Sequence, residues 1–256
     1  MKIRNFLALV DVKAKMSLKS DASKLYLSYL WWVLEPVLWV LMFYLVFTVL
    51  LGFGRDLLFL MCGKIPFLWF SKSVNSSSNS IVSGKALITQ TNVPRQFFPY
   101  EQVHTVLYRQ WLVFLVLFGM VMVYGYMPSL HWFWIIPLVV VQYLLILLVS
   151  LVAAVCVSYV RDTRILIGMA VMGLMFGSGI FWDLDRIADP VKRELLVTWN
   201  PLAYLLDGYR DVLIRGEMYD LQHLGWLALV LFCGLVLVHL FYRYMGQSMA
   251  SRVINS

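Results

Sequence analysis

Few polar residues in this chain are suited to chemistry, and they do not form a catalytic set. Asp183-Leu184-Asp185 has the D-x-D pattern that binds metal-bound sugar nucleotides, but it lies among eight acids in segment 183–222. The four histidines lack the spacing of metal ligands, and no HExxH or GxSxG motif occurs. These features predict that the chain is not an enzyme and binds no metal.

The sequence pattern also contains no nucleotide site. Two Gly-Lys pairs occur, at Lys64 and Lys85, but neither lysine is followed by Ser or Thr. Both pairs also lack the leading glycine of a Walker A motif. We therefore expect no cofactor on this chain, and a process driven by ATP would need a partner that binds it.

The elements that hold these residues are predicted to be membrane helices. Hydrophobic residues make up 61% of the 256-residue chain and charged residues 14%, and the mean hydropathy is +0.78. A soluble domain carries about 25% charged residues and cannot bury this much apolar surface. The composition excludes a soluble domain, a disordered chain and a secreted disulfide scaffold. It predicts an all-α polytopic membrane protein.

Six apolar segments are long enough to cross a bilayer, which takes about 20 residues of helix. They are residues 30–51, 65–82, 111–127, 132–159, 165–182 and 224–242. The second segment turns polar after Phe70, which predicts a helix that is buried against other helices or lines a wet cavity. Four glycines in the fifth segment suit close helix packing.

The distribution of Lys and Arg indicates the orientation. Six spans with a cytoplasmic N-terminus place 13 of these residues inside and 7 outside, whereas five spans would give 11 and 10. The positive-inside rule therefore favours six spans with both termini in the cytoplasm. We interpret the net charge of +7 as this bias plus attraction to anionic membrane lipids, and we expect no nucleic-acid partner.

Residues 1–24 predict an amphipathic helix along the cytoplasmic interface. They are not expected to be a signal peptide, because no compact apolar region with a cleavage site follows the basic residues. The helix is either a membrane anchor or a lever that touches a cytosolic partner. Its apolar face carries Ile3, Phe6, Leu7, Val10, Ala14 and Leu18, and its polar face carries Arg4, Asp11, Lys15 and Lys19.

Two connecting segments are too long and too patterned to be plain turns. The inner segment 83–110 carries Pro94 and Pro99 around a predicted short helix or turn, and it either returns the chain to the next span or docks a soluble partner. The outer segment 183–222 contains Asn200-Pro201, which predicts a helix capped by Asn200. Its apolar runs fit re-entrant or interfacial helices, which either cap a conduit or form a surface pair without a gating role.

Residues of the first span are candidates for a substrate conduit. Glu35 lies about 7–8 Å into this span, where it either reaches the headgroups or faces a cavity at the inner mouth. Trp32, Trp39, Phe43 and Phe47 share one helical face. Such a face can stack on sugar rings, although packing or lipid contact is the commoner role of an aromatic stripe.

Six short motifs occur in order along the chain and resemble those of a known family. The chain is similar, from about Lys24 to Arg243, to the membrane subunit of ABC-2-type exporters, in the polysaccharide group that serves O-antigen, capsule and teichoic acid. Segment 83–91 is less basic than in that family. The motifs are YLWWVLEP at 29–36, Ile65-Pro66-Phe67, Asn79-Ser80-Ile81-Val82, Val93-Pro94-Arg95 with Pro99, Arg161-Asp162, and Trp199-Asn200-Pro201-Leu202 with Tyr209-Arg210.

The resemblance implies a homodimer that pairs with two copies of a separate ATPase subunit, on which ATP and Mg would bind. It assigns ATPase coupling to the N-terminal helix and inner loop, and an outer gate to the region after Trp199. The predicted substrate channel comprises Trp32, Glu35, Trp39, Phe43, Phe47, Lys72 and Asn75. The predicted coupling residues are Lys15, Lys19, Val93, Pro94, Arg95, Phe97 and Pro99, and the outer gate comprises Trp199, Asn200, Pro201, Tyr204, Tyr209 and Arg210.

The predicted function is that of a permease subunit of an ATP-driven ABC exporter. It would move a lipid-linked polysaccharide, such as O-antigen, from the cytoplasmic side outward across the inner membrane. Six spans are too few to enclose a conduit for a large polar polymer, whereas a symmetric dimer could enclose one. Two alternatives stay open: an exporter of a smaller lipid or drug, and a membrane-embedded enzyme that modifies glycans or lipids.

Overall fold

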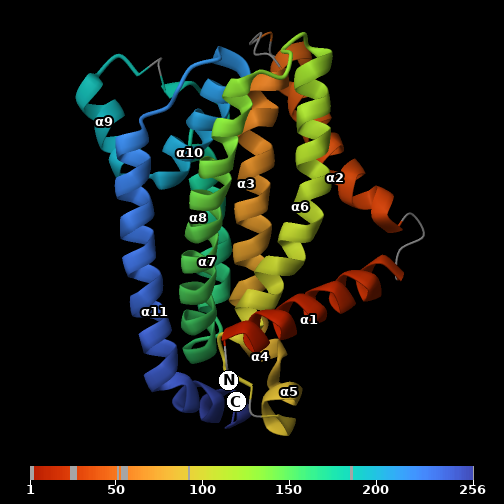
Figure 1. Ribbon diagram of the computed structural model, residues 1–256, viewed down its shortest axis with the longest axis vertical. Helices are drawn as coiled ribbons and strands as arrows, with labels where there is room; N and C mark the ends of the chain where they lie inside the picture. The colour runs from red at the N-terminus through yellow and green to blue at the C-terminus, as the bar shows by residue number, and fades with distance from the viewer. Residues whose placement is uncertain are drawn as a thin grey trace.

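The computed structural model describes residues 3–23, 28–50, 52, 57–91, 93–184 and 187–255. Within these ranges every regular element is a helix, which confirms the predicted helical class (Figure 1). The long helices α3 (Leu57–Ser78), α6 (Phe97–Val123), α7 (Ile135–Tyr159) and α11 (Leu221–Asn255) have aligned axes and form a bundle, in which α6 runs opposite to the other three. The beginning of α1 and the end of α11 lie at the same end of this bundle (Figure 1).

Four helices in the described ranges are long and apolar enough to cross a membrane. Two shorter apolar helices, Leu30–Trp39 and Thr163–Gly177, coincide with the predicted first and fifth spans. The first belongs to α2 (Ser28–Tyr44), which continues into the π-helical η1 (Leu45–Leu50). The helices confirm a polytopic membrane protein, and the count of six spans stays a prediction. The four long segments are Leu57–Ser78, Phe97–Val123, Leu130–Tyr159 and Leu221–Val253.

The central helix α3 begins earlier than the predicted second span. It starts at Leu57, eight residues before residue 65, because the sequence from Leu57 to Cys62 is apolar and continues the helix. Lys64 therefore lies inside α3 and is 5% exposed. The serine-rich half of α3 is buried against neighbouring helices at Ser73 and Ser77.

Pro66 lies inside α3 rather than at the start of a span. Proline removes a backbone donor and disturbs the hydrogen bonds of a helix interior. Two buried glutamines from neighbouring helices bind the backbone here. The side-chain amide of Gln110 on α6 donates to the carbonyl of Ile65 at 3.2 Å, and that of Gln142 on α7 donates to the carbonyl of Pro66 at 2.8 Å.

The inner segment 83–110 is mostly helical. The short helices α4 (Ser80–Ser83) and α5 (Lys85–Gln90) follow α3, and a turn at residues 95–96 leads into α6. Helix α6 begins at Phe97, 14 residues before the predicted third span. Pro99 lies in its first turn, where proline is tolerated, and neither Gly nor Pro follows before Trp111.

Other helix ends also differ from the predicted spans. Helix α6 ends at Val123, four residues before residue 127. Helix α7 begins at Ile135 rather than at residue 132, and the 3₁₀-helix η2 (Leu130–Trp134) leads into it. Helix α8 (Thr163–Gly177) ends five residues before residue 182, because Gly179 adopts a positive φ of 71° that glycine readily takes. Helix α11 continues 13 residues past residue 242, to Asn255.

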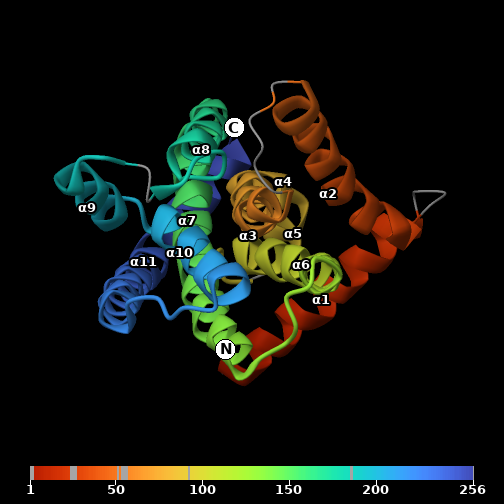
Figure 2. The ribbon, with the colours of Figure 1, turned by 90° about the horizontal axis from the view of Figure 1, so that it is seen from above.

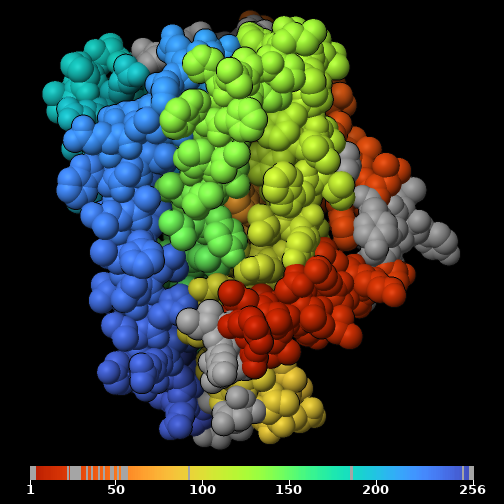
Figure 3. Space-filling model, viewed as in Figure 1, coloured from red at the N-terminus to blue at the C-terminus, as the bar shows by residue number. Residues whose placement is uncertain are grey.

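Helix α1 (Ile3–Ser23) lies across the bundle and against α6, near α5 (Figures 1 and 3). Its face toward the bundle buries Val10 and Ala14, and Lys15 and Lys19 are exposed, as the amphipathic pattern predicts. Leu7 belongs to the predicted apolar face but is 47% exposed. The face of α1 that is buried against the bundle is therefore narrower than the predicted apolar face.

The outer segment folds into α9 (Pro190–Trp199), α10 (Pro201–Arg210) and the π-helical η4 (Asp211–Arg215). Helix α10 packs against α3 and α7, whereas α9 buries no residue and lies at the periphery (Figure 2). Asn200 caps α10 and Pro201 occupies its first turn, which confirms the predicted helix start.

Candidate functional site

Four of the seven predicted channel residues line one cavity. This cavity has a volume of about 440 Å³ and lies among α2, α3 and α6. The structure therefore brings together residues of the first and second predicted spans. The four residues are Trp32 and Glu35 from α2 and Lys72 and Asn75 from α3.

An ion pair joins two of these residues. Lys72 Nζ lies 2.7 Å from Glu35 Oε2, and the two side chains are 40% and 37% exposed. Glu35 therefore lines a cavity, and its position relative to the lipid headgroups stays a prediction. A pair this exposed contributes only about 0–1 kcal/mol to stability.

Two polar residues of α6 also line this cavity and were not predicted. Arg109 lies over the ring of Trp32, with 5.0 Å between its guanidinium carbon and the ring centroid, and Gln110 also lines the cavity. Both directly precede Trp111, where the third span was expected to begin. They were assigned to the loop because the earlier start of α6 was not recognised, although long polar residues at a predicted membrane boundary are a signal for such a site.

The three other predicted channel residues do not line this cavity or have side chains outside the described part of the chain. Trp39 does not line this cavity; it is 44% exposed, with its ring centroid 5.7 Å from Lys64 Nζ. Lys64 Nζ also lies 3.0 Å from the sulfur of Met175 and so links α3 to α8. The side chains of Phe43 and Phe47 lie outside the described part of the chain.

Polar contacts hold α1 on α6. Three residues of α1, spread along its length, each pair with a residue of α6, and Phe6 packs edge-on against Phe97 with centroids 6.4 Å apart. Movement of α1 would therefore be transmitted to α6. The three pairs are Tyr108 to Asp11, Ser17 to Glu101, and Arg109 to Asp21.

The predicted coupling lysines, Lys15 and Lys19, lie on the exposed face of α1, away from the helix bundle. Lys15 Nζ donates to Asp11 at 2.8 Å. Hydrogen bonds from Lys15 and then Tyr108 lower the pKa of the Asp11 carboxyl, and the bond to Asp11 raises the pKa of the Lys15 ammonium. Lys15 therefore stays charged, and its side chain is 62% exposed. Lys19 is also exposed.

The predicted coupling residues of the inner loop divide into two groups. Phe97 and Pro99 are buried and hold the beginning of α6 in place. Val93, Pro94 and Arg95 are half-buried. Arg95 Nη1 donates to the carbonyl of Val93 at 2.6 Å, and burial lowers the pKa of the Arg95 guanidinium.

Asn200 of the predicted gate connects α8 to α10. Its Oδ1 accepts hydrogen bonds from the amides of Leu202 and Ala203, at 3.1 and 3.3 Å. Its Nδ2 donates to the carbonyl of Gly177 at 3.1 Å and to Ser178 Oγ at 3.0 Å. One side chain therefore caps α10 and fixes it to the end of α8.

Other predicted gate residues are buried in the bundle. Tyr209 donates to Gln142 Oε1 at 2.7 Å, and Tyr204 donates to the carbonyl of Asp220 at 2.6 Å. Pro201 is half-buried in the first turn of α10. Trp199, in contrast, is 78% exposed at the end of α9. The predicted gate residues therefore belong to two different helices: α10 is packed into the bundle, whereas α9 is exposed.

Arg210 is 1% exposed and joins three elements. Its Nη2 donates to the carbonyl of Gly179 at 2.8 Å, and its guanidinium lies 3.8 Å from the ring centroid of Phe59 on α3. Burial lowers the pKa of Arg210 to about 10, which the nearby Asp207 opposes. The side chain therefore keeps its charge near neutral pH and holds α10 against α3.

The D-x-D pattern takes part in an ion network. Asp183 Oδ1 lies 3.2 Å from Arg215 Nη2, and Arg215 also pairs with Asp207 and Asp211. Asp185 lies outside the described residues. In the described part of the chain, no three His, Cys, Asp or Glu side chains are grouped as they would be to hold a metal ion.

Comparisons with known proteins give results that agree with one another. Residues 17–214 match the family described as ABC-2 type transporter. An O-antigen export system permease protein, RfbA, of Klebsiella pneumoniae is 28% identical over 218 residues, which cover 82% of this chain and 80% of that protein. The protein of the same name from Myxococcus xanthus is 28% identical over 208 residues and 80% of each chain.

Proposed function

We propose, since this chain belongs to the ABC-2 type transporter family, that it is the permease subunit of an ATP-driven exporter of a lipid-linked surface polysaccharide. The cargo would be O-antigen or a similar glycan, moved outward across the inner membrane. The observation that carries this proposal is the similarity to O-antigen export permeases along 80% or more of this chain.

The proposed topology has six spans with both termini in the cytoplasm. The four long helices together with α2 and α8 supply six apolar helices. An even number of spans agrees with the placement of the start of α1 and the end of α11 at one end of the bundle (Figure 1).

We place the conduit between two copies of the chain, along the face formed by α2, α3 and α8. Figure 2 shows α2 and α8 on either side of α3. The polar residues Lys72 and Asn75 lie on α3, and α8 carries exposed apolar side chains such as Met169 (66%) and Met172 (63%). A homodimer would cover such a surface and enclose a path with a polar wall.

Two copies of an ATPase subunit would supply the energy, because the sequence contains no Walker A motif. Lys15 and Lys19 on α1 and the loop of Val93, Pro94 and Arg95 are the proposed contacts with this partner. Closure of the ATPase pair around ATP would favour one arrangement of the spans by binding it more tightly. The contacts of α1 with α6 provide a route for this movement into the bundle.

The outer gate is proposed to involve α9 and α10. Asn200 and Arg210 fix α10 to α8 and α3, so α10 would move only together with these helices. The exposed α9 would rest on the outer membrane surface. Re-entrant backbone of this kind is tolerated where protein buries it, as it buries α10.

The test is the location of the glycan in cells that lack the gene. A membrane-impermeant lectin is applied before and after permeabilisation, and cells complemented with the wild-type gene are the control. We expect lectin binding only after permeabilisation in the deletion strain. Absence of glycan on both sides would indicate a synthetic enzyme instead, and normal surface glycan would leave an exporter of a smaller lipid or drug.

A further inference from the structure

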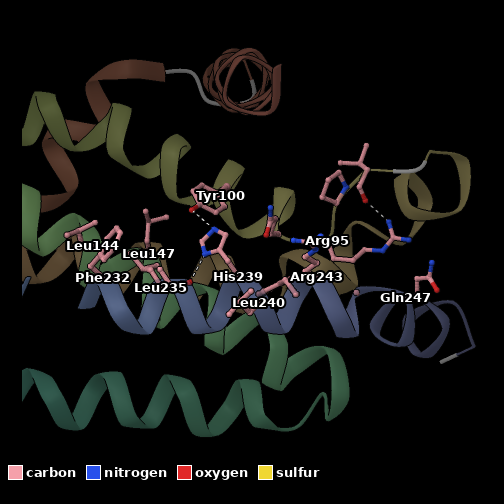
Figure 4. Close-up of a pocket in the computed structure, with 16 residues that line it drawn as sticks. Arg95, Tyr100, Leu144, Leu147, Phe232, Leu235, His239, Leu240, Arg243 and Gln247 are labelled. Carbon is pink, nitrogen blue, oxygen red and sulfur yellow. Dashed lines mark hydrogen bonds between the residues drawn. The ribbon is translucent and has the colours of Figure 1, made fainter. Parts of the chain in front are cut away.

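A second cavity, of about 1070 Å³, lies on another side of the bundle from the channel residues. It is bounded by the inner loop at residues 93–96, the beginning of α6, α7 and the second half of α11 (Figure 4). Helices α11 and α2 lie on opposite sides of the α3–α7 pair (Figure 2). This cavity is therefore separate from the proposed conduit.

The lining of this cavity changes from apolar to basic along its length. Leu144, Leu147 and Phe232 form one end, and Arg95 and Arg243 lie at the other (Figure 4). The described residues that line it include no Asp or Glu. The basic end therefore has no carboxylate in its lining, and an anion would be attracted to it.

His239 and Tyr100 line the middle of the cavity (Figure 4). His239 Nδ1 lies 2.7 Å from the carbonyl of Leu235, and because a carbonyl only accepts, Nδ1 carries a proton. His239 Nε2 and the Tyr100 hydroxyl form a hydrogen bond of 2.9 Å. These two side chains therefore pair with each other, and Arg95 and Arg243 supply the positive charge of the basic end.

Arg95 is held in place and retains unused donors. Its Cγ would lie 3.8 Å from a Cβ at Gly246, so its stem runs close to α11. Its Nη1 donates to the carbonyl of Val93, and its Nε is enclosed without a hydrogen-bond partner in the described part of the chain. A guanidinium has five N–H donors, so this side chain can also bind a phosphate.

The length of the cavity matches one leaflet of a bilayer. Phe232 and Arg243 are eleven residues apart on α11, which is about 16 Å of helix. Half of a hydrocarbon core that is about 30 Å thick has nearly the same length. The α11 wall is also accessible from the side, because Phe232 is 60% and Leu240 43% exposed.

We propose that this cavity binds an anionic phospholipid. Its acyl chain lies along Leu144, Leu147 and Phe232, and its headgroup phosphate binds Arg95 and Arg243. A free phosphate would leave the apolar end unfilled, and a zwitterionic headgroup would offset the charge that the arginines attract. The lipid joins α11 to the inner loop, and so it fixes the orientation of Val93 and Pro94.

The test measures lipid binding to the purified full-length chain in detergent and does not use a transport assay. Thermal unfolding is followed during titration with a short-chain phosphatidylglycerol, with the matching phosphatidylcholine, and with inorganic phosphate. We expect only phosphatidylglycerol to raise the melting temperature. The double variant Arg95→Gln/Arg243→Gln should weaken this binding about thirty-fold, since each arginine near a membrane surface contributes about 1 kcal/mol to anionic lipid binding.

Two control variants separate this effect from misfolding. Arg164→Gln removes an exposed charge at the same end of the bundle and should leave binding unchanged. Gln247→Arg adds a charge to the lining and should tighten binding about fivefold.

Four results would overturn the proposal. They are an equal response to phosphatidylcholine, an equal response to phosphate alone, unchanged binding in the double variant, and cross-linking of two copies through Val236→Cys after replacement of Cys156 and Cys233. The last result would mean that a second copy of the chain covers this face. A failure of glycan export in cells would leave the binding test unaffected.

Discussion

Tyr209 of α10 donates a hydrogen bond to Gln142 of α7 across 2.7 Å, and both side chains are fully buried. The amide of Gln142 in turn donates to the carbonyl of Pro66, in the middle of α3. A chain of two hydrogen bonds therefore connects the outer helix α10 to the proline of the central helix. Neither group has access to water, so a broken bond leaves a buried polar atom unsatisfied.

The first prediction concerns this buried connection. Tyr209→Phe leaves Gln142 Oε1 without its donor and should lower the free energy of unfolding by about 1–3 kcal/mol. Thermal unfolding of the purified protein measures the change. Tyr124→Phe is the control, because Tyr124 is 47% exposed and its hydroxyl can bind water. Equal stability of the two variants would contradict a structural role for the bond.

The second prediction concerns the close approach of Gly63 to Arg210. A Cβ at residue 63 would lie 2.5 Å from Arg210 Nη2, so Gly63→Ala must displace the guanidinium from its carbonyl partners. We expect a loss of about 1–3 kcal/mol in stability. Gly173→Ala on α8 is the matched control: apart from the neighbouring backbone of its own helix, no atom of the described residues lies within 4 Å of its Cβ, and alanine favours helix. A loss of the same size in both variants would refute the steric explanation.

The third prediction uses the ion pair between Glu35 and Lys72. Glu35→Lys or Lys72→Glu alone places like charges together and should lower glycan export by roughly fivefold, the upper range for an exposed pair. The double reversal Glu35→Lys/Lys72→Glu should recover most of this loss, because the attraction between α2 and α3 returns. Export and membrane abundance are measured in parallel. A double variant no better than the singles would mean that the charge of one residue, not the pair, matters.

The fourth prediction concerns pH and the contact of α1 with α6. The pKa of Asp11 is lowered from its ordinary value of 3.8 by hydrogen bonds from Lys15 and Tyr108. Above pH 3.8 the Asp11 carboxylate therefore contributes fully to the contact between α1 and α6. This contribution is lost as the pH falls through the lowered pKa that Asp11 has in the folded protein. Cleavage of α1 by pepsin should be slower in wild type than in Asp11→Asn near pH 4.5, and the difference should shrink as the pH is lowered below 3.8. A pH-independent difference would exclude this carboxylate as the cause.

Some features of this fold could be predicted from neighbouring residues alone. The start of α10 follows from Asn200-Pro201, because a cap and a first-turn proline act within one helical turn. The burial of the serine-rich part of α3 follows from its composition, since such a helix could not face lipid.

Other features depend on contacts between helices and leave no local signal. Gln110 and Gln142, from two other helices, bind the carbonyls of Ile65 and Pro66 inside α3, and no pattern around Pro66 indicates these partners. The partner of Glu35 could not be predicted either, because Lys72 lies 37 residues away on another helix. Helix packing therefore determines the cavity among α2, α3 and α6 more than any single motif does.

The fifth prediction separates the two tasks of Asn200. Its Oδ1 caps α10, and its Nδ2 binds Gly177 and Ser178 at the end of α8. Asn200→Ser keeps a capping oxygen but loses the amide donor, so its loss of stability measures the link to α8, about 0.5–1.5 kcal/mol. Asn200→Ala loses both and should cost about 1 kcal/mol more.

The control for the cap is Asp189, which accepts a hydrogen bond from the amide of Val191 at the start of the exposed helix α9. Asp189→Ala should lower stability by no more than about 1 kcal/mol, because it removes a cap and no link between helices. If α10 acts as an outer gate, Asn200→Ser should also change glycan export. Wild-type stability and export in Asn200→Ser would show that the contact of Asn200 with α8 neither holds α10 nor takes part in gating.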